Sequence, residues 1–207
     1  MRLKSHNIEV NISINNAGVA SFGSIRDSDP ETWWSAHESM LKGRYLVSRA
    51  YLRQRSLATI TTGAILMTSS IGSFRPGLAM SSHRIPKTAL NRPTDYIAAE
   101  CAADNNGVQC IAFHPGGVAD TGLTAGALDW LTERLTETAE LAAVAALWLS
   151  IPRVVWLNGR YVDVVGSHGV EKVEGEGGRD GWVEDCPERD GGVCWSVSSE
   201  NRACIDR

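Results

Sequence analysis

Residues 63–113 decide the fold, because two short apolar runs flank a helical stretch there. The first run reads Gly63-Ala64-Ile65-Leu66-Met67-Thr68, and the second, over residues 108–113, reads Val-Gln-Cys-Ile-Ala-Phe. Short runs that are nearly all apolar are typical of buried parallel strands. We interpret residues 82–103 between them as a helix, in which Pro93 is expected to cost about 3 kcal/mol or to produce a kink. A strand, a helix and a second strand in this order predict an α/β fold with a parallel sheet.

The alternation of strands and helices continues on both sides of this stretch. Asp29 and Pro30 have the pattern of a helix N-cap followed by a proline at the first helical position. An alternation of apolar and polar residues runs into the turn Asn15-Asn16-Ala17-Gly18, which is typical of a strand that ends in a turn. The further elements that we expect are a strand over residues 8–14, a helix from residue 30 to about residue 50, a helix over residues 138–149 and a strand over residues 158–165. Together they predict one domain over residues 1–165.

The composition is that of an ordinary globular protein, and it disfavours several classes of function. With 207 residues, 43% of them hydrophobic and 21% charged, the chain can bury a core, and its net charge of −4 disfavours a nucleic-acid-binding surface. No apolar run approaches the roughly 20 residues that span a bilayer, and the first residues have no pattern of a secretory signal. The five cysteines include no CxxC pair. This disfavours disulfides and a metal site, and indicates a reducing, cytoplasmic setting.

Beyond this domain the chain changes character. Residues 171–192 contain eight acidic and three basic residues, are dense in glycine and have few aliphatic side chains. Such a segment buries little apolar surface, so we expect residues 166–207 to be an acidic, glycine-rich and disordered tail. A solvated tail without a partner is the simpler interpretation, and binding to a basic partner is the alternative.

Five motifs lie at the ends of the predicted elements. They are Asn15-Asn16-Ala17-Gly18 after the first strand, Ser69-Ser70-Ile71-Gly72 after the second, Lys87-Thr88-Ala89-Leu90 on the following helix, Pro115-Gly116-Gly117-Val118 after the third strand and Leu157-Asn158-Gly159-Arg160-Tyr161-Val162 at the fourth. In this order and at this spacing they resemble the short-chain dehydrogenase/reductase family, and its fungal members most of all. The resemblance covers roughly residues 8–165 and implies a Rossmann-like parallel sheet with flanking helices.

The resemblance also implies a reaction and its catalytic residues. Family members reduce carbonyls or oxidise alcohols with NAD(H) or NADP(H), so it implies a nicotinamide cofactor and a small alcohol or carbonyl substrate. Ser70 matches the serine that holds the substrate oxygen, and Lys87 matches the lysine that binds the ribose. His83 stands in place of the proton-donating tyrosine, and Met40 in place of the asparagine that relays the proton. Methionine cannot relay a proton, and imidazole, although it titrates near neutral pH, is shorter than a phenol. The alternative for His83 is an exposed or locally hydrogen-bonded histidine on an inert site.

The cofactor-binding positions of the family lie after the strands, where ligands bind in open α/β sheets. Carried over to this chain, they are Asn15, Asn16, Gly18, Lys87, Pro115, Gly116 and Val118. Glycine at two of these positions allows the backbone to approach a cofactor closely. For the two asparagines, turn formation with hydrogen bonds between strands is an equally good interpretation. For the proline and the glycine that follows it, the alternative is a plain loop after a strand.

Two departures from the family pattern shape the functional expectation. The glycine-rich TGxxxGxG turn that grips the cofactor pyrophosphate has no counterpart before Asn15, so we expect a truncated sheet that lacks its first βαβαβ portion and binds NAD or NADP weakly. With the altered catalytic positions, this predicts an impaired or inactive oxidoreductase-family protein. One alternative is a non-catalytic remnant that associates with a full-length relative through its exposed strand edge. The other is a non-functional product. We expect contacts with identical or related chains, and neither nucleic acid nor a membrane as partner.

Overall fold

The computed structural model describes residues 8–55, 62–165 and 196–197. In chain order its elements are β1 (Ile12–Asn15), α1 (Pro30–His37), the π-helical turn η2 (Glu38–Lys42), α2 (Gly43–Arg55), β2 (Gly63–Thr68), the 3₁₀ turn η3 (Ile71–Ser73), α3 (Ser81–Ala103), β3 (Val108–His114), α4 (Asp129–Thr132), α5 (Ala139–Leu149), the 3₁₀ segment η4 (Pro152–Leu157), β4 (Tyr161–Asp163) and β5 (Ser196–Val197).

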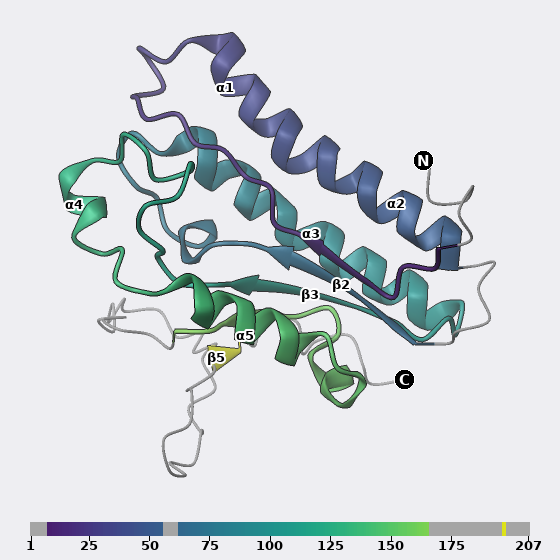
Figure 1. Cartoon of the computed structure of the whole chain (residues 1–207). Helices are drawn as coiled ribbons and strands as arrows, with labels where there is room; N and C mark the ends of the chain where they lie inside the picture. The colour runs from purple at the N-terminus through teal and green to yellow at the C-terminus, as the bar shows by residue number, and fades with distance from the viewer. Residues whose placement is uncertain (1–7, 56–61, 166–195, 198–207) are drawn as a thin grey trace, which may run out of the picture.

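One sheet organises these elements. Its strands lie in the order β1-β2-β3-β4-β5, the first four are parallel, and β5 pairs antiparallel with β4. The predicted α/β fold with a parallel sheet and flanking helices is therefore confirmed. In Figure 1, α2 and α3 lie on one side of the sheet and α5 lies on the other.

The core has two halves, one on each face of the sheet. Alternate residues of a strand point to opposite faces, so neighbouring residues of β2 belong to different halves. Leu66 packs in a cluster with residues of β3, α5 and β4, whereas Ile65 and Met67 pack with Tyr51 of α2 and Leu90 of α3. This arrangement explains why β2 and β3 read as continuous apolar runs in the sequence.

The elements with strong local signals are found where the sequence predicts them. β2 occupies residues 63–68 as predicted, and α3 begins one residue before its predicted start. Asp29 caps α1, where its Oδ1 accepts a hydrogen bond from the backbone N–H of Thr32 at 2.8 Å. Thr138 caps α5 in the same way, through a bond of 3.3 Å from Leu141 N–H to its Oγ1. α3 continues as one helix through Pro93, whose side chain is exposed.

β1 and β4 are both shorter than the strands that the sequence predicts. β1 begins at Ile12 instead of residue 8, and the carbonyl of Asn11 before it accepts a bond of 2.7 Å from the Tyr51 hydroxyl as well as one from β2. β4 begins at Tyr161 instead of residue 158. A turn precedes it, in which Gly159 has a φ of +74° and the Asn158 side chain accepts a hydrogen bond from Cys110 N–H.

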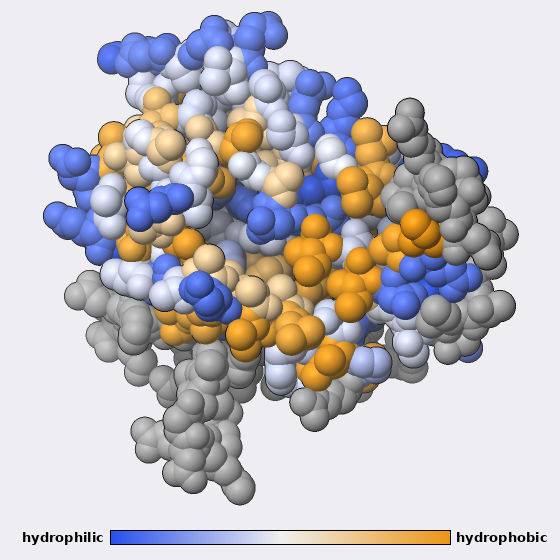
Figure 2. Space-filling view, in the orientation of Figure 1, coloured by the Kyte–Doolittle hydropathy of each residue, from blue (hydrophilic) through white to orange (hydrophobic). Residues whose placement is uncertain are grey.

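β1 is one of the two edge strands of the sheet that the described residues form. Its residues alternate, with Ser13 and Asn15 buried toward α2, and Ile12 and Ile14 exposed at 43% and 51% on the opposite face. Figure 2 shows apolar residues gathered on the face between β1 and α5. Of the tail that the sequence predicts beyond residue 165, Ser196 and Val197 pair with β4, and the rest lies outside the described residues. Among the described helices, none has the length and hydropathy required to cross a bilayer.

Candidate active site

The motifs that follow the first three strands meet along the side of the sheet that the carboxyl ends of its strands form, which we call the sheet edge. β1, β2 and β3 are parallel, so their carboxyl ends point to the same side (Figure 1). The turn after β1, the serines after β2 and the Pro115 segment after β3 therefore lie at one edge, which is where open α/β sheets bind their ligands.

Lys87 reaches this edge from α3. Its Nζ donates a hydrogen bond of 2.5 Å to the carbonyl oxygen of Thr68, the last residue of β2, and only 3% of the residue is exposed. Burial lowers the pKa of the Lys87 amine well below its ordinary value, and the nearby charge of Arg44 lowers it further. Removal from water disfavours the charged amine, so this lysine gives up its proton more easily than a lysine at the surface.

Arg44 belongs to the same cluster, and none of the five sequence motifs includes it. From the start of α2 its Nη1 donates to the Thr68 carbonyl and its Nη2 to the Ala17 carbonyl, both at 2.9 Å. Burial lowers the pKa of its guanidinium to about 10. The signal in the sequence was its spacing: Arg44 follows His37 by seven residues and Met40 by four, on the helical face that the structure buries.

His83 lies one turn before Lys87 on α3 and is 94% buried. Its Nδ1 lies 3.4 Å from the carbonyl oxygen of Val19, in the segment after β1. Burial, then the charge of Lys87, lower the pKa of this imidazole to about 4, so at neutral pH the ring is uncharged. The alternative of an exposed histidine is wrong, and the alternative of a local hydrogen bond agrees with the Val19 contact.

The other two catalytic positions are also accounted for. Ser70 caps η3, where its Oγ accepts a hydrogen bond of 3.0 Å from Gly72 N–H, and the residue is half-buried. Met40 lies in the π-helical turn η2 and is fully buried. A buried thioether offers neither a proton nor a strong acceptor, so no proton relay passes through this position.

The asparagines after β1 differ in their surroundings. Asn15 is buried, and its Nδ2 lies 3.2 Å from Ser48 Oγ on α2 and 3.5 Å from Met67 Sδ on β2. These contacts fit the structural interpretation of Asn15, which joins the strand to its neighbours. Asn16 is exposed. Gly18 lies beside the Arg44 guanidinium, whose Nη2 is 3.9 Å from where a Cβ of this glycine would be.

The loop after β3 is closely packed against Glu137. Gly116 has a φ of +97°, and a Cβ at this position would lie 2.8 Å from Glu137 Cγ. The Glu137 carboxylate accepts a bond of 2.7 Å from Gly117 N–H, and Val118 forms a parallel bridge with the Glu137 backbone. Both the fold and the side chains of this segment therefore require glycine at position 116.

A sequence profile described as short chain dehydrogenase matches residues 2–132, which is more than half of the chain. The chain belongs to the short chain dehydrogenase family.

Relatives and solved structures agree with this assignment. The short chain dehydrogenase mpl6 of Monascus purpureus is 36% identical over 156 residues, which cover 74% of this chain and 51% of the relative. The short chain dehydrogenase tazN of Aspergillus terreus is 34% identical over 75% of this chain and 34% of its own length. The chain thus spans about half the length, or less, of these curated relatives. A gluconate 5-dehydrogenase from Burkholderia cenocepacia, solved with NADP and tartrate, shares the fold with a TM-score of 0.69 at 22% identity, over 79% of this chain and 66% of that one.

The site of this short chain dehydrogenase has buried polar atoms that could bind a ligand at the sheet edge. Two buried polar atoms at the ends of β2 and β3, Thr68 Oγ1 and His114 Nδ1, have no hydrogen-bond partner among the described residues. Buried polar atoms that lack a partner are expected to meet one from a ligand or water. The Lys87 amine and the backbone of residues 115–118 lie at the same edge and would hold such a ligand there.

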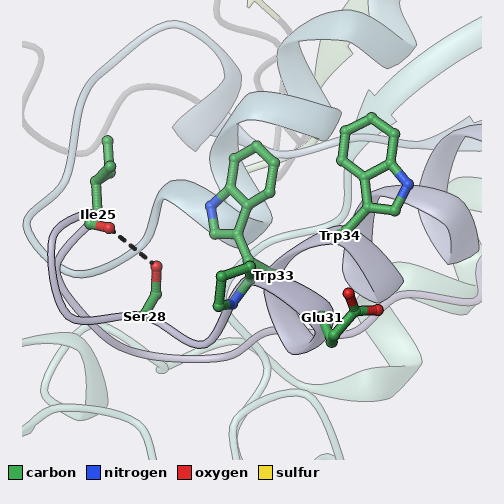
Figure 3. Close-up of a pocket in the computed structure, with 6 residues that line it drawn as sticks. Ile25, Ser28, Glu31, Trp33 and Trp34 are labelled. Carbon is green, nitrogen blue, oxygen red and sulfur yellow. Dashed lines mark hydrogen bonds between the residues drawn. The ribbon is translucent and has the colours of Figure 1, made fainter.

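Two surface pockets of the short chain dehydrogenase lie beside α1. The larger, of about 490 Å³, is lined by Ile25, Ser28, Pro30, Glu31, Trp33 and Trp34 (Figure 3), and the second, of about 410 Å³, faces the other side of the same helix. Neither is lined by Ser70, His83 or Lys87. Trp33 donates to Ser81 Oγ at the start of α3, so this indole links α1 to the helix that carries His83.

Proposed function

We propose that this short chain dehydrogenase carries the site for hydride transfer between NAD or NADP and an alcohol or carbonyl substrate, but that its own residues turn the substrate over poorly or not at all. The family membership supports the reaction class. The observation that supports impairment is His83: a buried, uncharged imidazole with a pKa of about 4 stands where the family has its proton donor.

The roles of the residues follow from their chemistry. Ser70 would hold the substrate oxygen with its hydroxyl, and Lys87 would bind the ribose with its amine. The bound cofactor would supply the hydride. Carbonyl reduction also needs a proton at the substrate oxygen, and an imidazole with a pKa of about 4 holds almost none at pH 7. Met40 cannot replenish it from solvent.

Cofactor affinity is the first test. The described residues offer contacts for the ribose and nicotinamide end, and we expect the chain to bind NADPH with a dissociation constant weaker than about 1 mM, or about −4 kcal/mol at best. Fluorescence titration of NADPH measures this directly. A micromolar dissociation constant would contradict the proposal, because residues outside the described ranges would then supply the phosphate contacts.

Turnover is the second test, measured as NADPH consumption with a panel of ketones and quinones. We expect none from the unmodified chain, and none from His83→Tyr alone. Rescue should require at least His83→Tyr and Met40→Asn together. Activity of the unmodified chain that disappears in His83→Ala would show that the histidine is a working acid–base and would refute the proposed impairment.

A second candidate function is association with a full-length relative without catalysis. The exposed edge of β1 and its two exposed isoleucines favour it, since unguarded edge strands pair with other strands. Size-exclusion chromatography with a relative such as mpl6 tests it. Ile12→Lys with Ile14→Lys should abolish a complex, whereas Ile85→Lys, at a similarly exposed isoleucine on α3, should not. Separate elution of the two unmodified chains would exclude this function.

A further inference from the structure

Arg44 joins three separate elements at the candidate site. It belongs to α2, one of its guanidinium nitrogens binds the carbonyl of Ala17 after β1, and another binds the carbonyl of Thr68 at the end of β2. These residues are 27 and 24 positions away in the sequence. A planar guanidinium with donors at fixed angles holds two acceptors in a defined relation, which a single ammonium group cannot do.

Arg44 and Lys87 share one acceptor. Their nitrogens lie 2.9 Å and 2.5 Å from the same Thr68 oxygen, so they are within about 5.4 Å of each other. Each residue is 97% buried, and in the described part of the chain neither forms an ion pair with a carboxylate. Two like charges this close in a buried site repel strongly. Burial, and then the charge of Arg44, lower the pKa of the Lys87 amine well below its ordinary value.

We propose that Arg44 is a positioning residue, which fastens the turn after β1 to the end of β2 and fixes both the place and the charge of the Lys87 amine. The proposal rests on the proposed function, in which Lys87 binds the ribose. In this proposal Arg44 acts on the site through the Thr68 carbonyl and does not itself contact substrate or cofactor.

Other titratable groups also affect the pKa values in this cluster, and their effects must be distinguished from the effect of Arg44. On α3 these are His83, which is uncharged at neutral pH, and Arg84, whose charge lowers the pKa of His83. At the end of β3, burial lowers the pKa of His114, the carboxylates of Asp163 and Glu137 oppose this, and the charge of Lys87 adds to it. All of these remain in place in an Arg44 variant, so a change in Lys87 on substitution of Arg44 reports Arg44 itself.

NMR titration of the full chain with 13Cε-labelled lysine tests the charge. The chain has four lysines, so Lys87 is assigned by one Lys87→Arg spectrum. Arg44→Gln should raise the titration midpoint of Lys87. Arg49→Met, at an exposed arginine on the same helix, should leave it unchanged. A Lys87 midpoint in Arg44→Gln equal to that of the unmodified chain would overturn the proposal.

Arg44→Lys tests the fastening, and it also decides the case if Arg44→Gln does not fold. A lysine keeps the charge but lacks the planar fork that holds the two carbonyls at fixed angles, so Lys87 should keep its low midpoint while amide hydrogen exchange in residues 15–18 becomes faster. Unchanged exchange there, or a raised Lys87 midpoint, would overturn the proposal. Neither measurement needs cofactor or turnover, so the result stands apart from whether the chain is an active oxidoreductase.

Discussion

Replacing His83 with a side chain that does not titrate should make the stability of this protein less dependent on pH. In the folded chain the imidazole has a pKa of about 4, whereas its ordinary value is 6.5, because burial and the charge of Lys87 disfavour protonation. The unfolded chain therefore binds a proton at His83 more readily than the folded chain. Stability is fully present above pH 6.5 and is lost as the pH falls toward 4.

The size of this effect follows from the two pKa values. Between them lie about 2.5 pH units, which correspond to a loss of about 3 kcal/mol in the free energy of unfolding once the pH is below 4. Between pH 7 and pH 5 the loss attributable to His83 is about 2 kcal/mol. For a domain of this size that is a large share of the total stability.

Urea unfolding at pH 7 and at pH 5 measures the effect. The unmodified chain should lose about 2 kcal/mol more than either His83→Gln or His83→Phe over this interval. The two variants differ in size and polarity, so their common behaviour separates titration from repacking. If both variants lose as much stability as the unmodified chain, His83 is not a depressed histidine, and the reason given for poor proton donation fails.

Two further substitutions test the local structure. Asp29→Ala removes the N-cap of α1 and should lower the free energy of unfolding by about 1 kcal/mol, seen as a lower melting temperature in circular dichroism. Gly116→Ala should destabilise the chain more than Gly126→Ala in urea unfolding, because both glycines have positive φ but only at Gly116 would a Cβ lie 2.8 Å from the Glu137 side chain. Equal losses from the two glycine variants would show that the Glu137 contact is absent in solution.

The elements with local signals were predictable from the sequence. β2 and β3 are buried on both faces by α2, α3 and α5, so their apolar character is continuous, and the caps Asp29 and Thr138 mark their helices by chemistry within three residues. The ends of β1 and β4 were not predictable, because they depend on distant groups. The Tyr51 hydroxyl, 40 residues away, binds the carbonyl of Asn11 just before β1.

The candidate site likewise contains residues that the sequence predicts and others that it does not. Spacing places His83 one turn before Lys87 on α3, and both are found together at the sheet edge. For Arg44 the sequence offers only its spacing from His37 and Met40, because its partners are backbone carbonyls, which leave no mark in the sequence. The boundary at residue 165 stays a prediction.

The role of Arg44 also bears on the rescue experiment. In the family to which this chain belongs, a charged lysine is expected to stabilise the tyrosinate that forms at the position of His83. Burial and the charge of Arg44 lower the pKa of Lys87 in this chain, so a phenol introduced at position 83 would face an amine that gives up its charge more easily than an ordinary lysine. Adding Arg44→Gln to a rescued chain that carries His83→Tyr and Met40→Asn should therefore lower the pH at which its activity begins. If the activity profile does not move, the charge of Lys87 is not what limits the rescued site.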